Sequence, residues 1–327
     1  MSRIIIGIHG LGNKPQQKTL RAWWKASIGE GMKAFAKSKR SYNFELVYWA
    51  QYFNPLPLQP RVKDKDHPLY IEDPYYKAPK GAEVKAPGDF RQKVLDYVDA
   101  KLDKLFLNDD LTINYTSITD FIIRHFFKDL EAYYGNDYVN KPGAQCRVKE
   151  VICSYLANVL KKHRQKKILL IAHSMGSIIA YDVLTQYARD VNIDTLVTIG
   201  SPLGLPIIQS KLMVDAGREH SQKGLLKTPE NILNHWYNLS DLRDKIAIDY
   251  KLADDFEANS RQVRPEDKIV VNNYEFMGAK NPHKVFGYLR TAEMAWIIDA
   301  YLGAGKFDPF IWLGKIMPFK WNRNVAF

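Results

Sequence analysis

A serine stands where two hydrophobic patterns meet. The stretch ILLIAHSMGSIIA, residues 168–180, runs from a continuous apolar segment into one with helical spacing, with Ser174 at the junction. Ala172 and Gly176 lie two positions to either side. A tight strand-to-helix turn exposes the side chain at its apex and tolerates only small residues two positions away, usually as G-x-S-x-G. Ala172 departs from that pattern by one methyl group, and the context predicts that Ser174 is a nucleophile.

A serine hydroxyl needs a neighbouring base, and enzymes built on such a turn carry an acid and then a histidine further along the chain. The downstream histidines are His220, His235 and His283. His235 falls inside a predicted strand, and His220 precedes the strand that should carry the acid. We therefore expect His283, just before the last predicted helix, to be the base. The alternative is that it only caps that helix.

The acid should follow the strand that ends near residue 239. The segment NLSDLRDKIAID, residues 238–249, offers Asp241, Asp244 and Asp249. Asp244 has the reach to turn toward the histidine, and Asp241 is the runner-up. In the competing interpretation, either aspartate forms a surface ion pair with Arg243 or Lys245, which would contribute little stability.

Acyl transfer also needs backbone N–H donors placed where negative charge develops on the substrate oxygen. The residue after the nucleophile, Met175, should supply one of them. The loop IHGLGNKP, residues 8–15, follows the first predicted strand and contains closely spaced glycines. We expect the amide of Leu11 in this loop to be the second donor.

The elements that must position these residues alternate along the chain. Buried strands are predicted at 4–8, 44–49, 168–172, 194–200, 234–240 and 268–271. Helices are predicted at 17–36, 148–160, 178–187 and 284–302. Such alternation is typical of a parallel sheet covered by helices.

Five segments occur in the order typical of the α/β-hydrolase superfamily: HGLGN, AHSMGS, TIGSPLGLP, SDLRD and NPHKVFGYL. Within it, the chain resembles the lipase and esterase branch related to lipid deacylases and acyltransferases. The resemblance implies a mostly parallel central sheet of six or slightly more strands, flanked by helices, and ester hydrolysis without a metal or organic cofactor. Residues beside these motifs are expected to contact the substrate: Gly10, His173, Ser201, Pro202 and Leu203.

The chain divides into three parts. Residues 1–49 and 146–303 should form the core, and residues 50–145 a cap insertion. The insertion starts with a proline-rich irregular stretch and continues with helical patterns at 90–105 and 118–133. Its aromatic residues could line an acyl channel or simply pack the cap onto the sheet. The aromatic and basic tail, 304–327, would suit an anionic membrane surface or dock across the body.

The composition narrows the classes of protein. Of 327 residues, 46% are hydrophobic, and no apolar run approaches the roughly 18 residues needed to cross a bilayer. The two cysteines, Cys146 and Cys153, fall in one helical pattern and indicate packed thiols in a reducing compartment. We therefore expect a cytoplasmic protein, with peripheral contact to an anionic membrane as a further option. The net charge of +11 comes without a motif that reads nucleic acid, so a nucleic-acid partner is not expected.

Together these patterns predict a serine hydrolase of carboxylic esters, with a lipid-like or acyl ester as substrate. An acyltransferase or thioesterase would use the same three residues. The rival from another class is a non-catalytic scaffold that binds a lipid or a protein.

Overall fold

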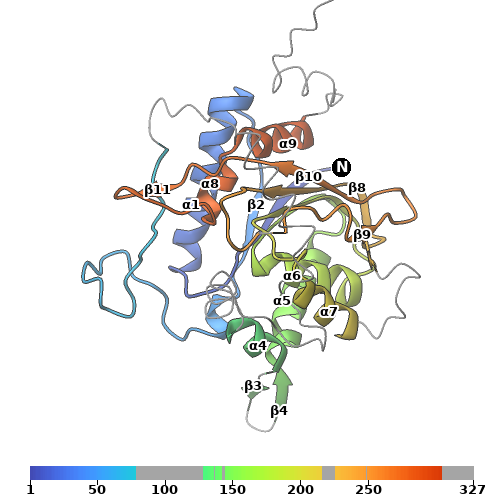
Figure 1. The fold of residues 1–327 in the computed structure, drawn as a ribbon, viewed down its shortest axis with the longest axis horizontal. Helices are drawn as coiled ribbons and strands as arrows, with labels where there is room; N and C mark the ends of the chain where they lie inside the picture. The colour runs from blue at the N-terminus through green and yellow to red at the C-terminus, as the bar shows by residue number, and fades with distance from the viewer. Residues whose placement is uncertain (79–127, 136, 142–143, 216–224, 248, 304–327) are drawn as a thin grey trace, which may run out of the picture.

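The computed structural model describes residues 1–78, 128–135, 137–141, 144–215, 225–247 and 249–303 (Figure 1). A six-stranded sheet in the order β10-β8-β6-β5-β1-β2 forms its centre, and every neighbouring pair is parallel. The strands are β1 (Arg3–Ile8), β2 (Phe44–Val47), β5 (Lys167–His173), β6 (Ile193–Ile199), β8 (Ile232–Ser240) and β10 (Pro265–Ile269). The predicted fold class and strand number are confirmed.

Helices cover both faces of the sheet (Figure 1). One face carries α1 (Gln17–Gly31), α8 (Val285–Leu289) and α9 (Ala292–Leu302). The other carries α4 (Lys128–Gly135), α5 (Val148–Lys162), α6 (Met175–Asp182) and α7 (Pro206–Asp215). Strand β1 shows why a continuous apolar run suits this position. Its Ile4, Ile6 and Ile8 pack toward α5 and α6, while Ile5 packs toward α1, so both faces of the strand are buried.

Several short elements complete the described chain. Two π-helical turns, Met32–Ala36 and Val183–Tyr187, extend α1 and α6, and a 3-10 turn spans Ala50–Tyr52. Three two-stranded ribbons pair β3 (Asp137–Lys141) with β4 (Ala144–Arg147), β7 (Leu226–Lys227) with β9 (Phe256–Glu257), and β11 (Glu275–Phe276) with β12 (Ala279–Lys280). The ribbon β11–β12 directly precedes the loop of His283.

Three expectations about elements are wrong. The last predicted helix is two helices, because Thr291 caps a new one by accepting a hydrogen bond from the Met294 amide. The strand predicted at 268–271 starts earlier and ends at Ile269. Cys146 lies in β4 while Cys153 lies in α5, so the two cysteines do not share one helical face.

Part of the expected cap can be compared with the structure. Residues 50–78 run along the body: Leu58 bridges to Pro15, and the Tyr75 hydroxyl donates to Glu30. The helix expected at 90–105 and the tail at 304–327, with its membrane contact, lie outside the described residues, and the helix expected at 118–133 is described only from Lys128 onward, as α4. The division into core, cap and tail stays a prediction.

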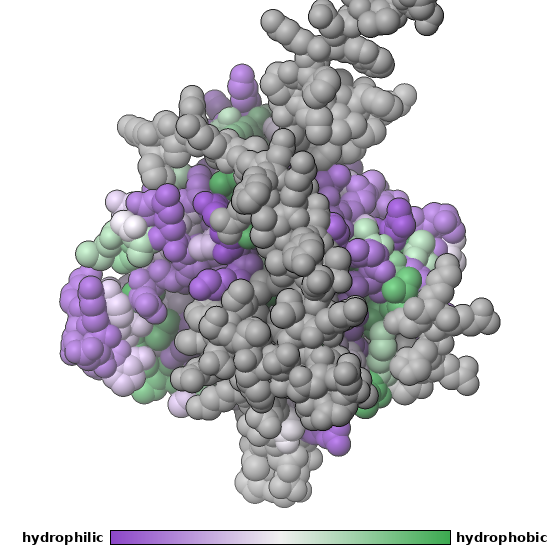
Figure 2. Space-filling view, in the orientation of Figure 1, coloured by the Kyte–Doolittle hydropathy of each residue, from purple (hydrophilic) through white to green (hydrophobic). Residues whose placement is uncertain are grey.

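No described helix combines the length and apolar character needed to cross a bilayer. On the face shown in Figure 2, hydrophilic residues dominate the described surface and hydrophobic ones form small separate patches.

Candidate active site

Ser174 stands at a strained turn between β5 and α6. Its backbone has φ 53° and ψ −127°, in the left-handed half of conformational space that non-glycine residues rarely adopt. Neighbouring segments leave room only for glycine nearby: a Cβ on Gly176 would lie 2.8 Å from the Ile8 carbonyl oxygen and 2.9 Å from that of His9. A Cβ on Gly10 would lie 2.7 Å from the Ser174 Cβ. The turn therefore packs directly against β1 and the loop that follows it.

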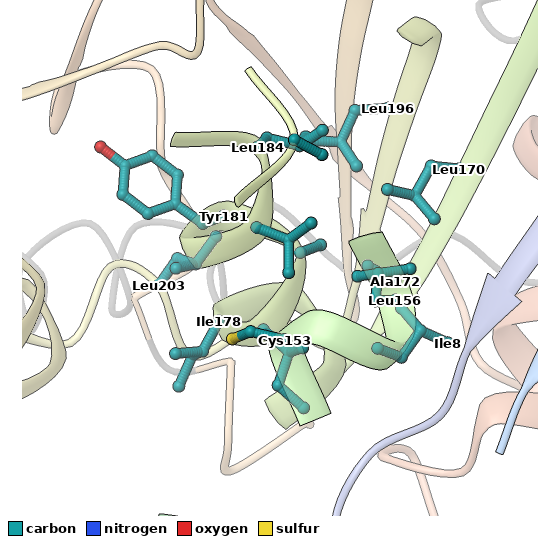
Figure 3. Close-up of a cluster of buried hydrophobic side chains, with 14 of the residues drawn as sticks. Ile8, Cys153, Leu156, Leu170, Ala172, Ile178, Tyr181, Leu184, Leu196 and Leu203 are labelled. Carbon is teal, nitrogen blue, oxygen red and sulfur yellow. The ribbon is translucent and has the colours of Figure 1, made fainter. Parts of the chain in front are cut away.

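The alanine that replaces the usual first glycine has a place in the core. Ala172 is fully buried at the end of β5 and packs in the apolar cluster that also contains Ile8 and Leu156 (Figure 3). Its methyl group fills space there and does not obstruct the turn.

The structure brings Ser174, His283 and Asp244 into one hydrogen-bonded chain. The Ser174 Oγ lies 3.0 Å from the His283 Nε2. On the other side of the ring, Nδ1 lies 2.8 Å from Asp244 Oδ2 and 3.0 Å from Oδ1. The ring can thus accept the serine proton while the carboxylate holds its other N–H, which is the arrangement that activates a serine.

The other candidates lie elsewhere. The half-exposed His235 lies in β8 and faces Glu266 at 3.3 Å, whereas His220 lies outside the described residues. Asp241, the runner-up acid, is buried and accepts hydrogen bonds from the backbone and guanidinium of Arg243 and from the Asn272 amide. It supports the loop and does not reach the histidine ring.

Tyr288 is a neighbour of the acid that sequence reasoning missed. Its hydroxyl donates to Asp244 Oδ2 at 2.7 Å and accepts from the Asp241 amide at 3.0 Å. Burial, reinforced by the charge of Asp244, raises the pKa of the Tyr288 phenol well above its usual value, so the phenol stays a proton donor. The Ile246 amide donates to the other carboxylate oxygen at 2.9 Å. Asp244 is therefore held on both oxygens.

The two expected oxyanion donors flank the serine. Met175 is the first residue of α6, so its amide has no acceptor inside its own helix. Leu11 lines the cavity above Ser174. Its loop is tied down by Lys14, whose Nζ donates to the carbonyls of Leu11 and Gly12.

His9 fixes the start of this loop. Its Nδ1 donates to the Gly10 carbonyl at 2.7 Å, and its Nε2 accepts from the amides of Trp49 at 3.1 Å and Ala50 at 3.3 Å. Burial, with a smaller contribution from Lys14, lowers the His9 pKa to about 3. The ring is neutral and works as a structural bridge from β1 to the segment after β2. Nothing in the motif HGLGN distinguishes this role from a catalytic one.

The expected substrate contacts divide into two groups. His173 lines the cavity, and its ring lies 4.9 Å from the His283 ring between centroids with the planes tilted by 36°. Its Nε2 donates to the His283 carbonyl at 2.9 Å. Burial, followed by the nearby His283, lowers its pKa well below the usual value. Gly10 lies beneath Ser174, where it allows the close approach described above, and it is not among the residues that line the cavity.

Ser201, Pro202 and Leu203 do not line the cavity formed by the described residues, and their contact with a substrate stays a prediction. Ser201 is buried and donates to the Ser177 hydroxyl at 2.8 Å, which in turn donates to the Ser174 carbonyl at 2.6 Å. Pro202 is buried and Leu203 lies in the apolar core (Figure 3). The loop supports the serine turn from below, because it follows β6 beside β5 and packs under α6.

A cavity of about 560 Å³ opens beside Ser174 and His283. Its apolar wall comes from Trp23, Trp24, Leu58, Ile71 and Phe286. The aromatic rings among these residues come from α1 and α8, whereas Leu58 and Ile71 belong to the start of the expected cap. Whether aromatic residues of the insertion line an acyl channel or only pack the cap stays open. Five cationic residues also line the cavity: Lys14, Arg243, Lys245, Lys280 and Lys284. Glu72 and Asp73 line it as well, and Lys284 lies 3.7 Å from Asp73.

Within the described part of the chain, no cluster of three or more histidine, cysteine, aspartate or glutamate side chains is arranged to hold a metal ion.

Comparison with known families gives one match. The family described as the PGAP1-like alpha/beta domain matches residues 90–272, more than half of the chain. The matched region contains Ser174 and Asp244, and His283 follows eleven residues after its end. No curated protein matches the chain.

Proposed function

The chain belongs to the PGAP1-like alpha/beta domain family, and from this membership and the geometry of the site we propose that it is a serine hydrolase of carboxylic esters. One observation carries the proposal: Ser174 Oγ lies 3.0 Å from His283 Nε2, and His283 Nδ1 lies 2.8 Å from Asp244. The left-handed backbone at Ser174 supports it, because strain of this kind concentrates at functional sites.

The reaction follows from these contacts. The Ser174 oxygen attacks the acyl carbon while His283 Nε2 takes its proton, and Asp244 stabilises the imidazolium that forms. The amides of Leu11 and Met175 hold the oxyanion. His283 then gives the proton to the leaving alcohol, which departs as the acyl-enzyme forms. Water, deprotonated by the same ring, releases the acid and regenerates the serine.

A lipid-like acyl ester is the substrate class that suits the cavity. Trp23, Trp24 and Phe286 offer rings, and Leu58 and Ile71 offer aliphatic surface, beside the serine. Burial of one methylene is worth about 0.8 kcal/mol, up to about fourfold in kcat/KM. We expect kcat/KM to rise with acyl length over a panel of p-nitrophenyl esters. A maximum at acetate would contradict the lipid-like substrate and leave the hydrolase proposal intact.

The hydrolase proposal is tested by labelling with a fluorophosphonate, comparing the wild type with Ser174→Ala and locating the adduct by peptide mass. Ser27→Ala is the matched control, because Ser27 is a buried serine of α1 that does not line the cavity. Labelling at Ser174 that disappears only in Ser174→Ala is the expected result. A folded wild type that neither reacts nor cleaves any ester in the panel would overturn the proposal and favour the binding scaffold.

A further inference from the structure

From outside the histidine loop, the side chain of Asn272 holds the backbone on either side of His283, while His173 donates to the His283 carbonyl itself. Asn272 follows β10 and is 3% exposed. Its Nδ2 donates at 2.8 Å to the Pro282 carbonyl and at 2.8 Å to the Lys284 carbonyl. These carbonyls belong to the residues immediately before and after His283. Both N–H donors of the Asn272 side chain therefore bind the backbone segment that carries His283.

The orientation of the Asn272 side chain is fixed by a third contact. Its Oδ1 accepts from the Tyr274 amide at 3.0 Å. Rotating the amide by half a turn would place a donor against the N–H of Tyr274 and an acceptor against two carbonyls. Only one orientation satisfies all three bonds, so the side chain acts as a rigid brace.

Helix α8 leaves room for this brace at a glycine. A Cβ on Gly287 would lie 1.5 Å from Asn272 Oδ1, 2.4 Å from its Cγ and 3.0 Å from its Nδ2. The three nearest atoms all belong to the Asn272 side chain. Any larger residue at position 287 would therefore displace Asn272 from the histidine segment.

The same residue also reaches the segment that carries the acid. The backbone N–H of Asn272 donates to Asp241 Oδ2 at 2.6 Å, and its backbone carbonyl accepts from the Arg243 guanidinium at 2.9 Å. Both partners stand within three residues of Asp244. Asn272 thus contacts the backbone beside His283 through its side chain and the segment of Asp244 through its main chain.

We propose that Asn272, in the space left by Gly287, is a positioning residue that sets the distance between His283 and Asp244. The proposal rests on the proposed function for its kinetic consequence and on the contacts above for its structural one. A displacement of about 1 Å in a reacting group can lower activity about 100-fold. Loss of the brace should therefore lower kcat and leave KM nearly unchanged, because Asn272 does not line the cavity.

Two substitutions distinguish the effect of the Asn272 hydrogen bonds on His283 from the stability loss expected at any buried asparagine. Asn272→Asp keeps the size and the acceptor for Tyr274 but removes both donors, and Asn272→Ala removes the whole amide. The matched control is Asn259→Ala. Asn259 is also 3% exposed and its Nδ2 donates to two carbonyls, those of Pro229 at 3.0 Å and Ile232 at 2.9 Å. Neither carbonyl belongs to the segment of His283 or to that of Asp244. All three variants should lose stability, and only those at position 272 should lose kcat, by about 100-fold.

A double-mutant cycle tests the link to Gly287. Gly287→Ala alone should lower kcat about as much as Asn272→Ala, because the new methyl expels the amide. Added to Asn272→Ala, it should lower kcat less than about threefold further, since the obstructing atoms are gone. Additive losses would contradict the link. Gly29→Ala is the control, because a Cβ there meets no atom within 4 Å.

One measurement keeps the inference testable without any substrate. In histidine-labelled protein, the ring N–H of His283 that bonds Asp244 should give a slowly exchanging proton resonance, absent from Asp244→Ala. It should disappear or broaden in Asn272→Ala and persist in Asn259→Ala. Persistence of both the resonance and kcat in the Asn272 variants would overturn the proposal. A wild type that cleaves no ester would instead contradict the proposed function, and the resonance would still decide the role of Asn272.

Discussion

The two halves of the candidate site are held by different physical means. On the serine side, Gly10 and Gly176 allow backbone segments to touch, and steric fit sets the geometry. On the acid and histidine side, Tyr288 and Asn272 hold loops through hydrogen bonds from side chains. Steric fit of the backbone dominates the first half, with hydrogen bonds from His9 and Ser177 added to it. Hydrogen bonds dominate the second half, where Gly287 leaves room for Asn272.

This difference determines how each half should fail. Added volume should damage the serine side, where backbone atoms cannot yield. Substitutions of equal size should be enough to damage the acid and histidine side, where each donor has an assigned acceptor. The following changes test that contrast.

The largest effect should separate two neighbouring aspartates. Asp244→Asn keeps the shape but leaves His283 without an anionic partner, and we expect kcat to fall roughly 10⁴-fold. Asp241→Asn should lower kcat only about tenfold to 100-fold, because Asp241 acts through Arg243 and Asn272. Steady-state kinetics with a p-nitrophenyl ester would measure both. A larger loss from Asp241→Asn would exchange the roles assigned to the two residues.

On the serine side, Gly176→Ala should lower kcat about 100-fold. The new Cβ would lie within 3 Å of two carbonyl oxygens of the β1 segment, at Ile8 and His9, so β1 or α6 must shift and the oxyanion loop moves with it. Gly29→Ala again serves as the control, since a Cβ there meets open space. Rates of fluorophosphonate labelling would report the loss without dependence on substrate binding. Wild-type labelling by Gly176→Ala would show that steric fit does not govern this half.

A smaller effect is expected at Tyr288. Tyr288→Phe removes one of the donors to Asp244 and leaves the Asp241 amide without its acceptor, and we expect kcat to fall about tenfold with a stability loss of about 1–3 kcal/mol. Tyr301→Phe is the matched control, because that hydroxyl bonds to the backbone of Ile4, remote from the cavity. It should lose stability and keep kcat. Equal kcat in both variants would mean that the Tyr288 hydroxyl contributes to stability and not to the position of Asp244.

The same contrast explains what could be predicted from the sequence. The serine turn depends on neighbours within the segment 168–180, so its strand, apex and helix were predicted with their small residues in place. The parallel sheet followed from alternating patterns in the same way. His283 and Asp244 were selected by their order along the chain, and the structure brings them to Ser174, although their catalytic roles stay a prediction.

What sequence patterns could not predict depends on contacts between distant segments. Asn272 and Tyr288 are common residue types in a loop and a helix, and only the fold shows that one braces the histidine segment and the other the acid. Residues 201–203 are expected to contact the substrate, but the sequence does not indicate that the Ser201 hydroxyl and the Leu203 side chain have partners beneath the serine turn. Trp23 and Trp24 lie within a predicted helix, but the helical pattern does not show that their side chains line the cavity.

The smallest expected effect concerns His9, where the serine side depends on a neutral ring. Its Nε2 accepts from two backbone amides. Protonation would turn Nε2 into a donor that faces these two N–H donors, and both hydrogen bonds would be lost. The folded pKa of about 3 lies below the ordinary value of 6.5, and the folded protein therefore binds fewer protons than the unfolded chain between these values. This contribution to stability is complete above pH 6.5 and decreases as the pH falls toward 3, by about 1 kcal/mol between pH 6.5 and 5.5.

Histidine-selective NMR titration would follow the His9 ring directly, with the urea-unfolded protein as the reference. We expect no protonation of His9 above about pH 4 in the folded protein. A ring that titrates near 6.5 without unfolding would show that the bridge between Gly10 and Trp49 is not required. In that case close packing alone would hold the serine side, and the contrast between the two halves would become sharper.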